Sequence, residues 1–277
     1  MFAAALAPAA QVADNLTPLR AAVLGAIQGA TEFLPVSSSA HLYAVPELLG
    51  WKYEGVAFDV ALHWGTLLAL LAAFWRDWLG LALGALKTGP EGGTARSTLL
   101  RLAAASVPAV VAGLLLQDEA STHLRALPLQ ATMLVVFGVL LWWVDRRRPG
   151  GRHADVPGWG TSLLVGAAQA VALVPGVSRS GITMTAGRAA GLDRVSAARF
   201  SFLLATPITF GAGLLELRHL PHDLPLATLA AGVSASALVG LLAIRGLLRW
   251  LGHAGFGAFC AYRVVFAGAI VVWLALR

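Results

Sequence analysis

The sequence predicts an all-α polytopic membrane protein, built as an inverted repeat with six transmembrane helices and two re-entrant helical hairpins. Three observations lead to this fold class. First, 58% of the 277 residues are hydrophobic and only 12% are charged, whereas about a quarter is charged in soluble domains. Second, six apolar runs approach the ~20 residues that a helix needs to cross a bilayer. Third, two further apolar runs are interrupted at their centres by proline and serine.

The six uninterrupted runs are the predicted transmembrane helices. They cover residues 56–75, 97–116, 128–143, 195–217, 224–244 and 254–276. A membrane β-barrel would instead show short segments of alternating polarity. The runs therefore favour helices throughout.

The two interrupted runs are the predicted re-entrant hairpins. The first joins residues 16–34 to 40–50 across Pro35 and a serine run, and the second joins 159–174 to 181–191 across Pro175 and Ser-Arg-Ser. Irregular backbone at membrane depth is tolerated only where it is buried in protein or lines a polar cavity. Each break is therefore expected to face the protein interior.

Matching segments in the two halves indicate an internal repeat. GAIQ at 25–28 recurs as GAAQ at 166–169, and VVFG at 135–138 recurs as VVFA at 264–267. We place repeat 1 at about 16–143, a linker at 144–158 and repeat 2 at 159–277, all within one membrane domain. Each repeat holds three crossings, so the second is inverted, and inverted repeats with broken helices place their site near the midplane.

The distribution of basic residues predicts the orientation in the membrane. The net charge is +6, and arginines gather in the segments 76–96, 144–158 and 245–253, which share one side in this topology. The positive-inside rule places that side in the cytoplasm and both termini outside. The first hairpin then enters from the outer face. Because topology and lipid headgroups account for the charge, no nucleic-acid partner is expected.

Polar residues gather at the first break. Gln28 and Glu32 are spaced i,i+4, so both project from one face of the first half-helix. Three serines (Ser37, Ser38 and Ser39) occupy the break, and one of them can cap the next half-helix. His41 falls in the first turn of that helix. The structural alternative is that the serines only cap backbone and that His41 is a buried core histidine.

The second break adds a positive charge. It contains Ser178, Arg179 and Ser180, and Thr183 follows one turn into the next half-helix. If the breaks face each other, two helix N-termini and an arginine converge, which favours an anion and above all a phosphate. A structural ion pair between Glu32 and Arg179 is the alternative.

One further polar pair remains open. Asp59 and His63 are spaced i,i+4 within the first full span. They form either a second polar layer beside the site or a buried pair of no functional role.

Long motifs resemble those of a known family. GAIQGATEFLPVSSSAHL, PGVSRSGIT and FSFLLATP closely resemble the bacterial undecaprenyl-diphosphate phosphatases of the bacitracin-resistance type, and FWRDW and YRVVFAGAIVVW also fit. The resemblance covers essentially the whole chain. It implies a multi-pass enzyme of the cell inner membrane that hydrolyses undecaprenyl diphosphate to undecaprenyl phosphate and inorganic phosphate. The product is the lipid carrier of peptidoglycan synthesis, and the activity confers bacitracin resistance.

The resemblance and the residue chemistry together assign roles to the two breaks. We predict Ser38 as the nucleophile or closest hydroxyl, Glu32 as base or orienting group, and Arg179 as the phosphate clamp. His41 is expected to act as acid or base, or alternatively as the nucleophile itself. The predicted substrate-binding residues are Gln28, Ser37, Ser39, Ser178, Ser180 and Thr183.

Three further expectations concern ligands and class. A divalent cation, Mg²⁺ or Ca²⁺, is expected between the phosphates and Glu32, although the family often has a glutamate where this chain has Gln28. The expected partners are the lipid substrate and the bilayer, and a homodimer is left open. The competing function is a prenyl-phosphate flippase, because transporters also combine inverted repeats with broken helices.

Overall fold

The computed structural model describes residues 16–51, 56–121, 123–216 and 224–277. Its regular elements are all helical: α1 Pro18–Phe33, α2 Ser38–Leu48, α3 Val56–Ala73, α4 Trp75–Ala85, α5 Gly89–Ser121, η2 His123–Arg125, α6 Leu127–Arg147, α7 Trp159–Ala170, η3 Val171–Leu173, α8 Arg179–Ala189, α9 Arg194–Glu216, α10 Leu226–Leu251 and α11 Gly257–Ala275. Over the described residues the all-α prediction is confirmed.

The long helices confirm a multi-pass membrane protein. Among the described residues, α5, α6, α9, α10 and α11 are each long and apolar enough to cross a bilayer, and α3 with α4 makes a sixth candidate if that bent pair counts as one span. Five of the six predicted spans overlap these five helices, and the remaining one, 56–75, overlaps α3. Their orientation in the bilayer remains a prediction.

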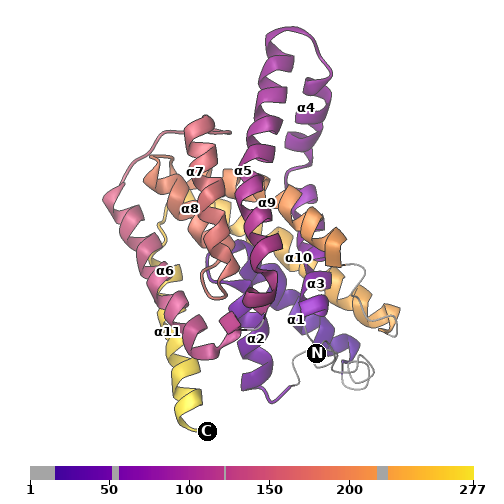
Figure 1. Ribbon diagram of the computed structural model, residues 1–277, viewed down its shortest axis with the longest axis vertical. Helices are drawn as coiled ribbons and strands as arrows, with labels where there is room; N and C mark the ends of the chain where they lie inside the picture. The colour runs from indigo at the N-terminus through magenta and orange to yellow at the C-terminus, as the bar shows by residue number, and fades with distance from the viewer. Residues whose placement is uncertain (1–15, 52–55, 122, 217–223) are drawn as a thin grey trace.

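The segment 76–96 differs from the sequence-based expectation of a loop. It forms α4 and the first turns of α5, and α4 is bent by 71° from α3. The two helices project together from one end of the bundle (Figure 1). They pack closely because Gly84 has no side chain: a Cβ there would lie 2.9 Å from that of Ala95. The charged residues of this segment favour a loop, although its leucines also permit a helix.

The two interrupted runs form two helix pairs, α1 with α2 and α7–η3 with α8. Figure 1 shows them in opposite ends of the bundle, with their breaks between them. α1 packs against α10 and α7 packs against α5, so the helix pair of each half is held by a helix of the other half. This exchange supports the repeat, whereas the re-entrant path through a membrane stays a prediction.

Glycines explain why the GAIQ and GAAQ segments are alike. A Cβ at Gly25 of α1 would lie 2.1 Å from the carbonyl oxygen of Gly232 in α10. A Cβ at Gly166 of α7 would lie 2.2 Å from the carbonyl oxygen of Ala105 in α5. Small residues allow this close approach of helix backbones, which is the usual device for helix packing in membranes. The two matched glycines therefore make the same kind of contact.

The linker is fixed to α8 by a buried arginine. Arg188 is 1% exposed, and its Nε donates to Asp145 Oδ1 at 2.9 Å. It also donates to the carbonyl oxygens of Gly150 and Arg148. Asp145 accepts a second arginine, Arg194, at 2.8 Å. Arg188 therefore anchors the end of α8 that lies far from the breaks.

Candidate active site

Both breaks have the same unusual backbone. Ser37 precedes α2 and Ser178 precedes α8, with φ angles of 76° and 75°. Residues other than glycine rarely adopt this left-handed region, and such strain gathers at functional sites. The side chains repeat too, since Ser37 Oγ lies 3.2 Å from Ser39 Oγ and Ser178 Oγ lies 3.2 Å from Ser180 Oγ. The matched sequence positions are therefore matched in conformation.

The two breaks meet at the centre of the bundle. Ser180 Oγ of the second break donates to the carbonyl oxygen of Leu34 in the first at 3.1 Å. Arg179 Nη2 donates to Glu32 Oε1 at 2.8 Å. A cavity of about 220 Å³ lies between the breaks and is lined by Thr31, Glu32, Ser37, Ser38, Ser39, His63, Ala172, Ser178, Arg179, Ile208, Thr209 and Ala212. The two breaks therefore lie together in the structure, as the sequence analysis predicts.

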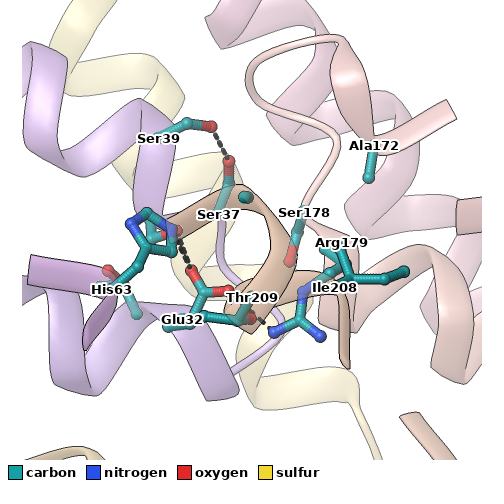
Figure 2. A pocket seen from close by; sticks show the side chains of 12 residues that line it. Glu32, Ser37, Ser39, His63, Ala172, Ser178, Arg179, Ile208 and Thr209 are labelled. Carbon is teal, nitrogen blue, oxygen red and sulfur yellow. Dashed lines mark hydrogen bonds and ion pairs between the residues drawn. The ribbon is translucent and has the colours of Figure 1, made fainter. Parts of the chain in front are cut away.

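Glu32 is the centre of the polar network (Figure 2). Its side chain is 8% exposed. Ser38 Oγ donates to Glu32 Oε2 at 2.5 Å, and Gln28 Nε2 donates to the same oxygen at 3.3 Å. A buried carboxylate is tolerated only when it is paired and hydrogen-bonded. Arg179 and these donors meet that requirement, while the Ser38 hydroxyl stays in the cavity.

Arg179 keeps donor capacity for a ligand. Its Nη2 binds Glu32, but its Nη1 is buried without a hydrogen-bond partner among the described residues. An unmet guanidinium donor in a polar cavity is costly, and an anionic ligand would satisfy it. The first residues of α2 and α8, Ser38 and Arg179, both line the cavity, and the first turn of a helix carries N–H groups without intrahelical partners. The arrangement suits an anion with several oxygens, such as a phosphate.

His63 belongs to the site, although the sequence left its role open. It lines the cavity from α3, with its Nε2 3.6 Å from Glu32 Oε2. Its Nδ1 lies 2.8 Å from the carbonyl oxygen of Asp59. Since a carbonyl can only accept, Nδ1 carries a proton and Nε2 is the nitrogen that faces the site. The sequence left two alternatives for Asp59 and His63, a polar layer beside the site or a buried pair of no functional role. The position of His63 matches the first.

His41 does not line the cavity. Its Nδ1 lies 2.7 Å from the carbonyl oxygen of Ser37, and its Nε2 lies 2.7 Å from the Tyr262 hydroxyl. The ring stacks on Phe266 at a centroid distance of 4.1 Å. Both nitrogens are engaged away from Glu32. The predicted catalytic role of His41 gains no support from this placement, and the alternative of a satisfied core histidine matches it.

The predicted substrate-binding residues separate into two groups. Ser37, Ser39 and Ser178 line the cavity with Ser38. Gln28, Ser180 and Thr183 lie behind it: Gln28 supports Glu32, Ser180 joins the breaks, and Thr183 Oγ lies 2.6 Å from Ser201 Oγ. The three serines that line the cavity can contact a ligand directly. Gln28, Ser180 and Thr183 instead orient the residues that line the cavity.

The residues of the cavity do not make a metal cage. No group of three histidine, cysteine or acidic side chains suited to a metal occurs among the described residues. Glu32 is the one carboxylate among the described residues that line the cavity, and Arg179 already pairs with it. Mg²⁺ and Ca²⁺ prefer several oxygen ligands. The expected divalent cation therefore has little support from this chain's own side chains.

Comparison with known proteins gives the family. A family model described as bacitracin resistance protein BacA matches residues 21–269. The chain belongs to this family. It is 48% identical over 264 residues to an undecaprenyl-diphosphatase of Pelotomaculum thermopropionicum, covering 95% of this chain and 98% of the relative. A protein of the same description from Desulforudis audaxviator is 46% identical over 267 residues, covering 95% and 100%. The resemblance seen in the motifs is confirmed, and membership extends over both breaks.

Proposed function

We propose that this protein hydrolyses undecaprenyl diphosphate to undecaprenyl phosphate and inorganic phosphate. Its relatives carry the name of that enzyme over nearly their full length. Their names favour hydrolysis over the flippase alternative. The observation in the structure that carries the proposal is the contact of Ser38 and Arg179, from opposite breaks, with one carboxylate, Glu32. That constellation combines a nucleophile, a base and a phosphate clamp within one cavity.

The first step uses the hydroxyl of Ser38. Glu32 accepts its hydrogen bond at 2.5 Å, so the carboxylate can take the proton as the oxygen attacks the terminal phosphorus. The new Ser38 O–P bond forms as the bond from that phosphorus to the bridging oxygen breaks. Undecaprenyl phosphate leaves with the bridging oxygen. Arg179 stabilises the charge on the phosphoryl oxygens, as an electrostatic clamp does in phosphoryl transfer.

The second step returns Ser38 to its free form. The His63 Nε2, which lies 3.6 Å from Glu32 Oε2, takes a proton from water as that water attacks the phosphoserine. The O–P bond to Ser38 breaks as Glu32 returns the proton that it took in the first step to the serine oxygen, and inorganic phosphate is released. Direct attack by water, with Ser38 as a hydrogen-bond donor, gives the same products without the covalent intermediate. No step of either path uses a divalent cation.

The cavity has an apolar wall that suits the lipid chain. Ala172 of η3 and Ile208 and Ala212 of α9 are the apolar residues among those that line it. A prenyl diphosphate has the same division into a charged head and an apolar chain. We place the diphosphate at the breaks and the first isoprene units against α9.

Phosphate release by the purified protein tests the function. The detergent-solubilised enzyme is given a prenyl diphosphate, with and without EDTA, and the inorganic phosphate is measured. Release with wild-type protein and its loss in Ser38→Ala are expected. Binding of the prenyl diphosphate without release would contradict the proposal and would favour a carrier. Loss of wild-type release in EDTA would show that a divalent cation takes part.

We also propose that the site opens to the periplasm from the inner membrane. The arginine-rich linker is taken as cytoplasmic, and the α1–α2 pair occupies the opposite end of the molecule (Figure 1). The substrate head would then be processed outside the cytoplasm. Single cysteines at Ala126 and Gly150, in a Cys260→Ser background, test this with a membrane-impermeant maleimide in intact cells. Gly151 is avoided because a Cβ there would lie 2.5 Å from the Asp193 amide nitrogen.

Ala126 is expected to react and Gly150 to be protected until the cells are opened. Both positions are exposed and lie outside the helices. The reverse pattern would place the first break, and hence the mouth of the site, on the cytoplasmic side. Reaction of both in intact cells would contradict a single orientation.

A further inference from the structure

A buried arginine of α11 contacts both breaks at once. Arg263 is 0% exposed. Its Nη1 donates to the carbonyl oxygen of Pro35 in the first break at 3.3 Å. Its Nη2 donates to the carbonyl oxygens of Gly176 and Val177 in the second, at 2.8 and 3.1 Å. The three acceptors belong to backbone that has left its helix.

These carbonyl groups need a partner from elsewhere. Among the described residues, no backbone N–H bonds to the oxygen of Pro35, Gly176 or Val177. Inside a membrane protein, water is scarce and an unmet carbonyl group is costly. A guanidinium offers five N–H donors in a rigid plane, so one side chain can serve several acceptors. Arg263 thus replaces the hydrogen bonds that the helices lose at both breaks.

The remaining donors fix the arginine to α6. Nε donates to the carbonyl oxygen of Leu134 at 2.7 Å, and Nη2 also reaches that of Met133 at 3.1 Å. Arg263 makes no ion pair with a described residue. All its hydrogen bonds to described residues go to backbone carbonyl oxygens. The position of the guanidinium therefore depends on the positions of these backbone segments, and their positions depend on it.

Two glycines leave room for the side chain. A Cβ at Gly138 of α6 would lie 3.1 Å from Arg263 Cδ and Nε, and one at Gly181 of α8 would lie 3.2 Å from its Nη1. Contacts of this length are tighter than van der Waals packing allows without movement. The space between α6, α8 and α11 is therefore shaped for this arginine.

We propose that Arg263 is a positioning residue that holds the two breaks in register, so that Glu32 and Ser38 from one meet Arg179 from the other. Pro35 lies between Glu32 and Ser38 in the chain, and Val177 precedes Arg179 by two residues. A shift of either carbonyl moves the adjacent side chains relative to the other break. Arg263 is not among the residues that line the cavity. The proposal rests on the proposed function only for its activity readout.

The first test compares Arg263→Gln with Arg188→Lys. Gln can replace only part of the hydrogen bonding, and a misalignment of about 1 Å can cost about 10² in rate. We expect kcat of the folded, monodisperse enzyme to fall by about that factor with KM unchanged, and Arg263→Lys to recover part of it. Arg188→Lys alters an equally buried arginine that binds the linker, so it is expected to lower the melting temperature and to leave kcat unchanged.

The second variant retains the arginine but moves it. Gly138→Ala pushes on Arg263, whereas Gly268→Ala of α11 meets open space. The first is expected to lower kcat and the second to have no effect. A loss confined to KM in the Arg263 or Gly138 variants would mean that the charge binds substrate, and would overturn the positioning role. Unchanged kcat in both would overturn it too.

A distance measurement separates this proposal from the proposed function. Spin labels at Ser39→Cys and Ala172→Cys, in a Cys260→Ser background, report the separation of the two breaks across the cavity (Figure 2). A single narrow distribution is expected with Arg263, and a broad one with Arg263→Gln. Phosphate release is measured on the unlabelled enzyme, because both labels lie in the cavity. Broadening in the labelled protein, with no phosphate release from the unlabelled wild-type enzyme, would refute the proposed function while supporting the positioning role. An unchanged distribution, with phosphate release from the unlabelled wild-type enzyme, would refute the positioning role alone.

Discussion

The two breaks have the same backbone and different chemistry. Ser37 and Ser178 share a left-handed φ and a serine neighbour two residues on. Between these serines, the first break has Ser38 and the second has Arg179, and both side chains reach Glu32. The first half contributes the carboxylate, while Leu173 occupies the matched position in the second. One half therefore supplies nucleophile and base, and the other supplies the cation.

This difference shows how a repeated scaffold makes an asymmetric site. A reaction that transfers a phosphoryl group needs unlike groups on opposite sides of the phosphorus. The shared strained turn places a side chain from each half against Glu32, and a few substitutions then give each side its role. The ion pair between the breaks would be lost if both halves carried the same residues, because two arginines or two serines cannot form one.

The largest effect is expected from removing the carboxylate that the second break lacks. Glu32→Gln eliminates the acceptor of the Ser38 proton and the partner of Arg179, so kcat should fall by about 10³. Phosphate release by the folded enzyme measures this. Glu47→Gln is the control, because that carboxylate lies at the end of α2 and pairs with the exposed Arg277. Equal activity of the two variants would contradict the asymmetry of the breaks.

Removing the cation of the second break should cost slightly less. Arg179→Ala eliminates one charge clamp on the phosphoryl group, which is worth about 10²–10³ in rate. Arg152→Ala, on the linker surface, is the matched control and should keep full activity. Arg188 is no such control, because it is buried and paired with Asp145, and its loss would unfold the protein rather than test the site. A mild effect of Arg179→Ala would remove it from the chemistry.

Substitution of the two histidines near the first break, His63 and His41, is expected to have different effects: the first on kcat and the second on stability. His63→Asn removes the ring beside Glu32 and should lower kcat by about 10². His41→Asn loses buried hydrogen bonds and should cost about 1–3 kcal/mol of unfolding free energy while the folded enzyme keeps its kcat. Activity and thermal melting, measured on the same samples, separate the two. A loss of kcat in the stable fraction of His41→Asn would return His41 to the acid–base chemistry.

The smallest effect on rate is expected from the matched glutamines. Gln28→Glu puts a second carboxylate beside Glu32, which must bind a proton or a cation to be stable. We expect this variant to stay active and to become more sensitive to EDTA. Gln169→Glu, at the matched position in α7, would bury a carboxylate where Gln169 has no hydrogen-bond partner among the described residues. It should lower the yield of folded protein without metal dependence, and equal metal dependence of both would contradict this distinction.

The local pattern of the chain predicted the breaks and their serines, and it offered the pairing of Glu32 with Arg179 as the alternative to a phosphate site. Proline, serine runs and i,i+4 spacing are local signals, and the cost of intramembrane charge indicates that the two charged residues meet. The direction of His41 and His63 could not be predicted, since it depends on which neighbouring helix faces each of them. The helix α4 was not predicted, because the charged residues of the segment 76–96 favour a loop. The role of Arg263 had one signal, an arginine inside an apolar run, but its acceptors lie on three distant segments.

The close contact of α1 with α10 has a consequence for biosynthesis. Gly29 of α1 approaches Ser236 of α10 so closely that a Cβ on the glycine would lie 2.4 Å from the serine carbonyl oxygen. About 200 residues separate the two in the chain, which a ribosome needs about 10–40 s to add. During that time the α1–α2 pair lacks its contact with α10, and its polar break must wait beside the insertion machinery or in contact with water. A nascent chain stopped after α9 should therefore expose the first break to protease, and the full chain should protect it.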